Sequence, residues 1–273
     1  MARSERIVAQ VFPFDLFGNS GTSGGAMLLG DVLREVVDDA ELEPRRTRQD
    51  AYAKRLRVEE TTFATMAELA AWRATGRALV KAHLGRDFLV WLGGNHLSVL
   101  PVYEELGPRD VLIQFDAHLD CYDLHDCTPE LSHGNFLLHA ASLPKLVNVG
   151  HRDLFLHPAD VRKSFAEAIP AADVHADLPG VAARLKKLTA KAERVWLDVD
   201  ADAFDPSACP AVHQSLPCGL SGGQFLALAR ALPWAKVAGL SISEYDPGRD
   251  VRDASLTLLG WLLEWLLLAA VEG

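Results

Sequence analysis

The sequence predicts an α/β protein in which helices cover both faces of a central, mostly parallel sheet, giving a three-layer α/β/α sandwich. The first observation is that short apolar runs alternate with amphipathic segments along the whole chain. The second is that 273 residues with 49% hydrophobic content are enough to bury one large core. The polar motifs extend from residue 93 to residue 206 without a linker, so we expect residues 1–273 to form a single domain.

Strands are expected where apolar runs are too short for a helix and rich in aliphatic and aromatic residues. Such runs are continuous rather than alternating, which is typical of parallel strands buried on both faces. They cover residues 7–12, 88–92, 111–115, 145–149, 195–197 and 236–242.

Helices are expected between these strands. A Gly/Ser turn at residues 18–25 leads into an amphipathic helix whose apolar positions are Leu28, Leu29, Val32, Leu33 and Val36. Residues 65–83 read as one long helix with an apolar face formed by Met66, Leu69, Ala70, Trp72 and Leu79. Residues 179–192 predict another helix, whereas residues 40–60 are polar and show no clear pattern.

The C-terminal segment, residues 254–271, is apolar and long enough to raise the question of a membrane span. Glu264 lies near its centre. Because a carboxylate in the middle of a bilayer is costly, we expect a helix packed on the sheet and no membrane association.

Charge and cysteine usage limit the function classes. The net charge is −10 and the basic residues are scattered apart from a cluster at residues 44–48, which argues against nucleic acid as a partner. The four cysteines form no CxxC pair, which suggests a reducing compartment, and the N-terminus leads into only a short apolar run, which predicts no signal peptide. We therefore expect a cytoplasmic protein.

Three polar clusters each follow one of the predicted strands. They are Gly93-Gly94-Asn95-His96, Asp116-Ala117-His118-Leu119-Asp120, and Asp200-Ala201-Asp202-Ala203-Phe204-Asp205-Pro206. Because function gathers at the carboxyl ends of parallel strands, these clusters should share one edge of the sheet. The candidate metal ligands are His96, Asp116, His118, Asp120, Asp200 and Asp202.

The spacing of these residues suits a pair of divalent cations. Ligands that alternate along an extended segment point the same way, as in Asp116-x-His118-x-Asp120 and Asp200-x-Asp202. Four carboxylates with two imidazoles favour a cation such as Mn²⁺ over structural zinc. Two cations that share carboxylates can lower the pKa of a water between them, so the clusters predict a hydrolase with two Mn²⁺ per chain.

A competing motif, Gly219-Leu220-Ser221-Gly222-Gly223, fits the nucleophile elbow of serine hydrolases. That elbow requires a buried strand directly before it, and residues 214–218 read as a loop. Ser221 with Gln224 is better interpreted as a capping box that opens a helix.

The three clusters resemble the motifs of the arginase or ureohydrolase family, which includes arginases, agmatinases, guanidino-acid hydrolases and formiminoglutamases. The family pattern is Gly-Gly-Asp-His, then Asp-Ala-His-x-Asp, then Ser-x-Asp-x-Asp-x-x-Asp-Pro. Weaker similarities cover most of the chain. They are Phe12-Pro13-Phe14-Asp15 with Gly24-Gly25-Ala26, Val149-Gly150-His151-Arg152-Asp153, and the segment from Leu240 to Pro247. The resemblance implies an arginase-like fold.

The resemblance also implies roles for individual residues. His96, Asp116, Asp120 and Asp200 would hold one Mn²⁺, and Asp116, His118, Asp200 and Asp202 the other, so that Asp116 and Asp200 bridge. The expected catalytic residues are His133 as a proton shuttle, Glu244 as the partner of a guanidinium-like group, and the ligand Asp120. Asp153 matches the position that, in arginases, helps to bind the α-amino group of the substrate.

The chain departs from the family pattern at three places. Asn95 and Asp198 replace the usual Asp and Ser, and the loop of residues 121–131 lacks the Asn and Ser that grip the α-carboxylate in arginases. Counted without gaps, Tyr122 and Pro129 take those two positions, so Tyr122 becomes a candidate substrate contact.

These features predict a binuclear manganese amidinohydrolase. We expect it to cleave a guanidino C–N bond of arginine or a derivative such as N-hydroxyarginine, releasing urea or hydroxyurea and an amine (ornithine). Agmatinase-like, guanidino-acid and formimino-substrate hydrolases are the alternatives, and a non-catalytic binding protein on a decayed scaffold is an alternative of another class. The expected partner is a small guanidino molecule, and a homo-oligomer remains open.

Overall fold

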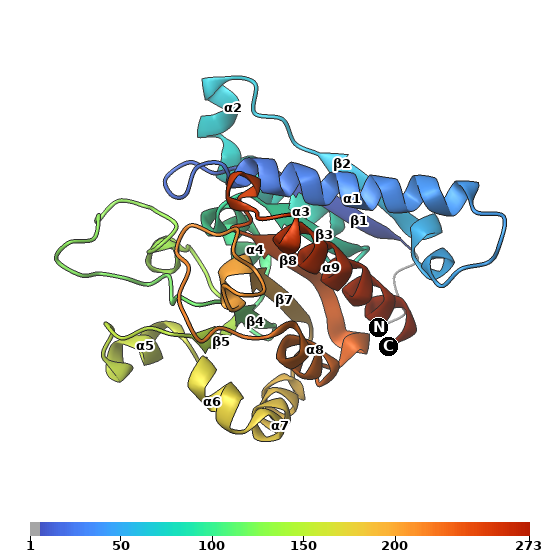
Figure 1. The fold of residues 1–273 in the computed structure, drawn as a ribbon. Coiled ribbons are helices and arrows are strands. Elements are labelled where there is room, and N and C mark those ends of the chain that lie inside the picture. The colour runs from blue at the N-terminus through green and yellow to red at the C-terminus, as the bar shows by residue number, and fades with distance from the viewer. Residues whose placement is uncertain (1–5) are drawn as a thin grey trace.

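The computed structural model describes residues 6–273. The expectation of no signal peptide concerns mainly residues 1–5, which lie outside the described part. Figure 1 shows a central sheet with helices on both sides, so the predicted three-layer α/β/α sandwich is confirmed.

All strands of the described residues belong to one eight-stranded sheet in the order β2-β1-β3-β8-β7-β4-β5-β6, and every neighbouring pair is parallel. The strands are β1 (Ile7–Phe12), β2 (Leu56–Glu60), β3 (Phe88–Gly93), β4 (Val111–Phe115), β5 (Lys145–His151), β6 (Glu167–Pro170), β7 (Val195–Asp200) and β8 (Val237–Ser243). The six predicted strands are all present; β1 and β4 have the predicted bounds, and the ends of the other four shift by one to three residues.

The α-helices are α1 (Thr22–Leu42), α2 (Met66–Ala70), α3 (Trp72–His83), α4 (Leu100–Glu105), α5 (Pro158–Ser164), α6 (Ala171–Ala176), α7 (Leu178–Thr189), α8 (Gly222–Arg230) and α9 (Ala254–Glu272). Side chains alternate across the sheet, so each strand contributes to two cores. One core packs against α1 and α6 to α9, and the other against α3 and α4. The capping box expected at Ser221 and Gln224 opens α8, which confirms that this segment is no nucleophile elbow.

The prediction of one long helix over residues 65–83 is wrong. Thr65 and Glu68 form a capping box that opens α2, and the segment divides at Ala71, where the backbone (φ −88°, ψ 3°) leaves the α-helical conformation before α3 begins. Met66, expected on the apolar face, is 77% exposed, while Trp72 is buried at the start of α3. The first helix also begins earlier than expected, at Thr22 within the predicted turn.

The two strands that the sequence analysis missed, β2 and β6, are the edges of the sheet. An edge strand is only partly covered, so it does not need the continuous apolar run that identifies a central strand. Most of β2 is exposed, and β6 ends at Pro170, which lacks a backbone N–H.

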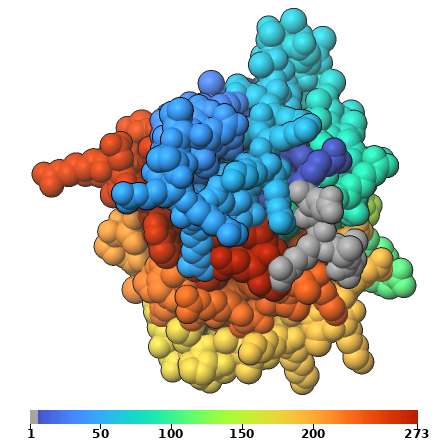
Figure 2. Space-filling view, turned by 90° about the vertical axis from the view of Figure 1, so that its right-hand side faces the viewer, coloured from blue at the N-terminus to red at the C-terminus, as the bar shows by residue number. Residues whose placement is uncertain are grey.

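Among the described helices, α9 alone is long and apolar enough to cross a membrane. Its buried leucines pack in the core beside α1, and its one acidic residue inside the apolar stretch, Glu264, accepts hydrogen bonds from Tyr52 and Gln49. In Figure 2, α9 (red) lies between blue N-terminal segments and orange atoms of the preceding segment. Packing within the fold therefore accounts for the apolar composition of this helix, as the sequence predicts.

The strand order places β3, β8, β7 and β4 side by side in the middle of the sheet. The three polar clusters follow, or begin within, β3, β4 and β7, and Glu244 follows β8. The carboxyl ends of these strands therefore form one edge that gathers residues from four distant parts of the chain.

Candidate metal centre and active site

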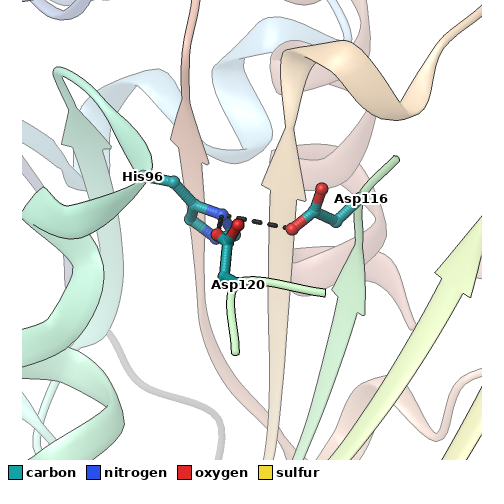
Figure 3. A group of neighbouring side chains, drawn as sticks. All are labelled: His96, Asp116 and Asp120. Atoms are coloured by element: carbon teal, nitrogen blue, oxygen red, sulfur yellow. Dashed lines mark ion pairs between the residues drawn. The ribbon is translucent and has the colours of Figure 1, made fainter. Parts of the chain in front are cut away.

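The first group of candidate ligands surrounds the imidazole of His96, which follows β3 and is 1% exposed. Its Nδ1 lies 2.7 Å from Asp120 Oδ2 and 3.2 Å from both Asp116 Oδ2 and Asp200 Oδ2. Figure 3 shows Asp116 and Asp120 facing this ring from the end of β4 and the loop that follows it. One imidazole nitrogen and three carboxylates thus converge on a small buried volume.

The second group shares Asp116 with the first. His118 Nδ1 lies 2.9 Å from Asp202 Oδ2 and 3.8 Å from Asp116 Oδ1. The oxygens and nitrogen of these three residues are close enough together to hold a metal ion, as are those of His96, Asp116 and Asp120. The structure therefore brings all six predicted ligands into two adjoining groups, with Asp200 next to His96 at the end of β7.

Among the described residues, no Lys or Arg side chain forms an ion pair with the buried acids of this site, and their basic neighbours are the imidazoles of His96 and His118. Arg152 is the nearby cation among the described residues, but its guanidinium donates to the backbone carbonyls of Gly150, Ala203, Asp202 and Leu216. Burial and then repulsion from Asp120 raise the pKa of Asp116 to about 7, and burial with repulsion from Asp202 raises that of Asp200. Unpaired buried carboxylates are costly, so the donor set fits bound divalent cations.

Local hydrogen bonds fix the directions of these carboxylates. Gln114 Nε2 donates to Asp116 Oδ2 at 2.7 Å, the His118 amide donates to Asp116 Oδ1 at 2.6 Å, and the Ala117 amide donates to Asp202 Oδ1 at 3.1 Å. Asp120 adopts a left-handed backbone conformation with φ 44°. Such strain in a non-glycine residue is held by its surroundings and clusters at functional sites.

Glu244 and His133 form a pair beside the first group. Glu244 follows β8, is 2% exposed and also has a left-handed backbone, with φ 64°. Its Oε1 accepts the His96 amide at 2.8 Å and lies 3.3 Å from His133 Nδ1. Burial lowers the pKa of His133, but the hydrogen bond to Glu244 outweighs this effect and raises it.

A loop of residues 15–19 after β1 also belongs to this site, although sequence reasoning did not identify it. Asn19 Nδ2 donates to Glu244 Oε2 at 2.8 Å, Asn95 Nδ2 donates to the Leu16 carbonyl at 3.0 Å, and the Phe17 carbonyl accepts the His133 amide at 3.0 Å. The donation from Asn95 requires an amide, which an Asp in its place would lack. Its sequence, Asp15-Leu16-Phe17-Gly18-Asn19, has no spacing of ligands or catalytic residues that could have marked it as part of the site.

The two remaining candidates, Asp153 and Tyr122, lie near one another on the loops after β5 and β4. Asp153 Oδ2 accepts the amides of Phe155 and Leu156, whereas its buried Oδ1 has no hydrogen-bond partner. The Tyr122 hydroxyl accepts the Leu119 amide at 3.3 Å. Asp153 therefore shapes its own turn and keeps one oxygen free, while the hydroxyl of Tyr122 faces the ligand-bearing loop.

Comparison with known proteins shows which family has this fold and these motifs. The model of the arginase family matches residues 6–268. The chain belongs to the arginase family. This confirms the resemblance drawn from the three clusters.

Curated relatives and solved structures agree with this membership. The chain is 30% identical over 182 residues to a mitochondrial arginase of Medicago truncatula, covering 62% of this chain and 51% of that protein. It is 28% identical over 166 residues to an agmatinase of Neisseria meningitidis, covering 59% of this chain and 53% of that protein. The matched part thus spans about half the length of these relatives.

Among solved structures, the agmatine ureohydrolase of Thermoplasma volcanium superimposes with a TM-score of 0.77 at 22% identity, covering 98% of this chain and 90% of that one. The arginase of Entamoeba histolytica gives a TM-score of 0.78 at 18% identity, with 97% and 98% of the two chains covered. At these identities the structures establish the shared fold.

The buried acids of this arginase-family site predict how stability depends on pH. Burial lowers the pKa of His118, but the charge of Asp202 outweighs it and raises the pKa to about 10 in the protein without metal. A raised histidine pKa stabilises the fold fully below about pH 6.5, and this contribution is lost as pH rises toward 10. Ionisation of Asp116, which begins from about pH 4 in the unfolded chain but centres near 7 in the fold, costs stability in the same direction.

We therefore expect the melting temperature of chelator-treated protein to fall between about pH 6 and pH 9. Added Mn²⁺ should raise the melting temperature more at the higher pH, because cations replace protons on these ligands. Differential scanning fluorimetry with and without MnCl₂ measures both effects. Equal metal stabilisation at both pH values would contradict the expectation.

Proposed function

We propose that this chain is a manganese-dependent amidinohydrolase that hydrolyses a guanidino C–N bond, and that residues 1–273 act as one metallohydrolase domain. The observation that carries the proposal is the convergence of two imidazoles and four buried carboxylates, with no Lys or Arg partner among the described residues, next to the Glu244–His133 pair. Family membership supports a hydrolase with this type of substrate.

The residues divide into two ligand sets. His96, Asp116, Asp120 and Asp200 would hold one Mn²⁺, and Asp116, His118, Asp200 and Asp202 the other. When bound, the two cations would supply Lewis acidity and lower the pKa of a water between them. Asp116 and Asp200 would belong to both sets, because each lies against His96. In addition, Asp116 accepts the amide of His118, and Asp200 accepts the amide of Asp202.

The chain's own side chains would then handle the substrate and the protons. Glu244 would accept paired hydrogen bonds from the guanidinium, and the contacts from the His96 amide and Asn19 hold its carboxylate in place. As water adds to the guanidino carbon and the C–N bond breaks, the departing nitrogen must gain a proton. His133 would deliver it, since its contact with Glu244 keeps the imidazole protonated to higher pH.

For the substrate tail we propose an amino acid, as in arginine or N-hydroxyarginine, which would yield ornithine with urea or hydroxyurea. The free Oδ1 of Asp153 is available to an ammonium group. Tyr122 stands in place of a smaller polar residue of arginases, and Asn95 and Asp198 change the surroundings of the first ligand set. These differences would leave room for an altered terminal nitrogen.

The substrate proposal predicts a ranking of kcat/KM, the quantity in which discrimination is expressed. Arginine or N-hydroxyarginine should exceed agmatine and guanidinobutyrate, and Asp153→Ala should lower kcat/KM for the amino-acid substrates by about 10- to 100-fold, the value of one charged hydrogen bond. Asp126→Ala, which removes an exposed acid from the neighbouring loop, is the matched control and should change little.

Assays of urea or hydroxyurea release and of the amine product measure the ranking. A preference for agmatine together with indifference to Asp153→Ala would refute the amino-acid tail and leave the metal chemistry standing. Two bound Mn²⁺ without turnover of any guanidino or formimino compound would instead favour a binding protein.

A further inference from the structure

Asp198, which replaces the usual Ser of the family motif, lies in β7 directly behind the first ligand set. Its carboxylate is 0% exposed and accepts three hydrogen bonds. The donors are His96 Nε2 at 2.8 Å, the Tyr103 hydroxyl at 2.6 Å, and the Ser241 hydroxyl. Ser241 in turn accepts the indole N–H of Trp196 at 3.0 Å. This buried carboxylate is thus paired with three donors, which come from the segment after β3, from α4 and from β8.

The contact with Asp198 decides which nitrogen of His96 carries the proton. An ionised carboxylate only accepts hydrogen bonds, so Nε2 carries the N–H whenever the ring is neutral, which is the form that binds a metal. Nδ1 then presents a lone pair to the oxygens of Asp116, Asp120 and Asp200, and it has no hydrogen-bond partner. Nδ1 lies 2.7–3.2 Å from one oxygen of each of these three carboxylates. Acceptors this close together are compatible when a cation lies between them.

The second ligand set lacks such support. His118 Nδ1 faces Asp202, and no described side chain accepts a hydrogen bond from its other ring nitrogen. A carboxylate that accepts the outer N–H of a histidine ligand fixes the ring and increases its basicity as a ligand. The two ligand sets therefore differ in whether a carboxylate supports their histidine.

We propose that Asp198 is a positioning residue that holds His96 in the metal-binding tautomer and makes the His96 half of the site the tighter of the two cation sites. The inference rests on the metal centre of the proposed function. Its consequence is ordered loading, in which the first Mn²⁺ occupies the His96 side and the second occupies the His118 side with lower affinity.

Mn²⁺ titration of the metal-free full chain, followed by calorimetry and by the electron paramagnetic resonance signal of free Mn²⁺, tests the proposal without any substrate. The wild type should show two steps. Asp198→Asn should weaken the tight step by about 10- to 100-fold, the usual effect of removing such a partner, and should leave the weak step nearly unchanged. Asp198→Ser restores the usual residue of the family, and its affinity in the tight step should lie between those of the wild type and Asp198→Asn.

Two further variants separate positioning from general destabilisation. Asp110→Asn removes another buried carboxylate, which pairs with Arg194 just before β4, far from the ligands along that strand. It should lower the melting temperature without changing either binding step. Tyr103→Phe removes one donor to Asp198 but keeps the charge, and it should weaken the tight step by less than Asp198→Asn.

The outcomes distinguish this inference from the proposed function. A wild type that binds no Mn²⁺ would overturn both. A wild type with two sites and unchanged constants in Asp198→Asn and Tyr103→Phe would overturn the role of Asp198 alone. Equal weakening of both steps, accompanied by the same loss of stability in Asp110→Asn, would show that Asp198 supports the fold rather than His96.

Discussion

Replacing Asp116 or Asp200 by Ala should abolish most metal binding and lower kcat/KM by more than about 100-fold, since removing a mere supporting partner of a ligand already costs 10- to 100-fold. Asp116 faces both His96 and His118, and Asp200 faces His96 while its Oδ1 accepts the amide of Asp202. In the proposed assignment each carboxylate belongs to both ligand sets, so neither set would be complete without it.

The matched control for these variants is Asp205→Ala. Asp205 lies on the same segment, but its carboxylate accepts hydrogen bonds from Ser207 and the Gly219 amide, so it organises a turn. This variant should lose about 1 kcal/mol of stability, typical of a lost capping interaction, and keep its metal. Metal content by plasma mass spectrometry and steady-state assays measure both. Full Mn²⁺ content with near-normal turnover in Asp116→Ala would remove the basis of the bridging assignment.

Replacing His133 by Ala should lower kcat by about 100- to 10,000-fold, the usual contribution of a positioned acid or base, while leaving metal content near that of the wild type. His133 contacts Glu244, and among the described residues it belongs to neither of the two candidate ligand groups. Its raised pKa means that the proton is retained as pH rises through neutrality and is lost above the folded value. Wild-type activity should therefore increase with pH as the attacking water ionises and then decline where His133 loses its proton.

The pH profile of kcat is the measurement that separates the roles. In His133→Ala the alkaline decline should disappear, because the group that causes it is gone. His125→Ala is the matched control, since this histidine lies on the preceding loop with a side chain that is 97% exposed, and it should keep the wild-type profile. Loss of Mn²⁺ from His133→Ala would make His133 a structural support of the metal centre and exclude the proton-shuttle role.

The sequence alone was sufficient for the sheet-and-helix alternation, the six central strands and the placing of six candidate ligands at one edge of the sheet. Each of these depends on short-range information. A central parallel strand needs a continuous apolar run, and ligands at alternate positions of an extended segment point the same way. The residues at the carboxyl ends of β3, β4 and β7 could therefore be assigned to one edge of the sheet before the strand order was known.

Only the tertiary structure decided which side chains meet behind and above the metal site. Asp198 reaches His96 across 102 positions of sequence, and Asn19 reaches Glu244 across 225. These contacts depend on the order β3-β8-β7-β4 and on the path of the loop after β1, which long-range pairing and packing determine. The edge strands β2 and β6 also depend on tertiary structure, since a partly covered strand does not display the continuous apolar run of a central one.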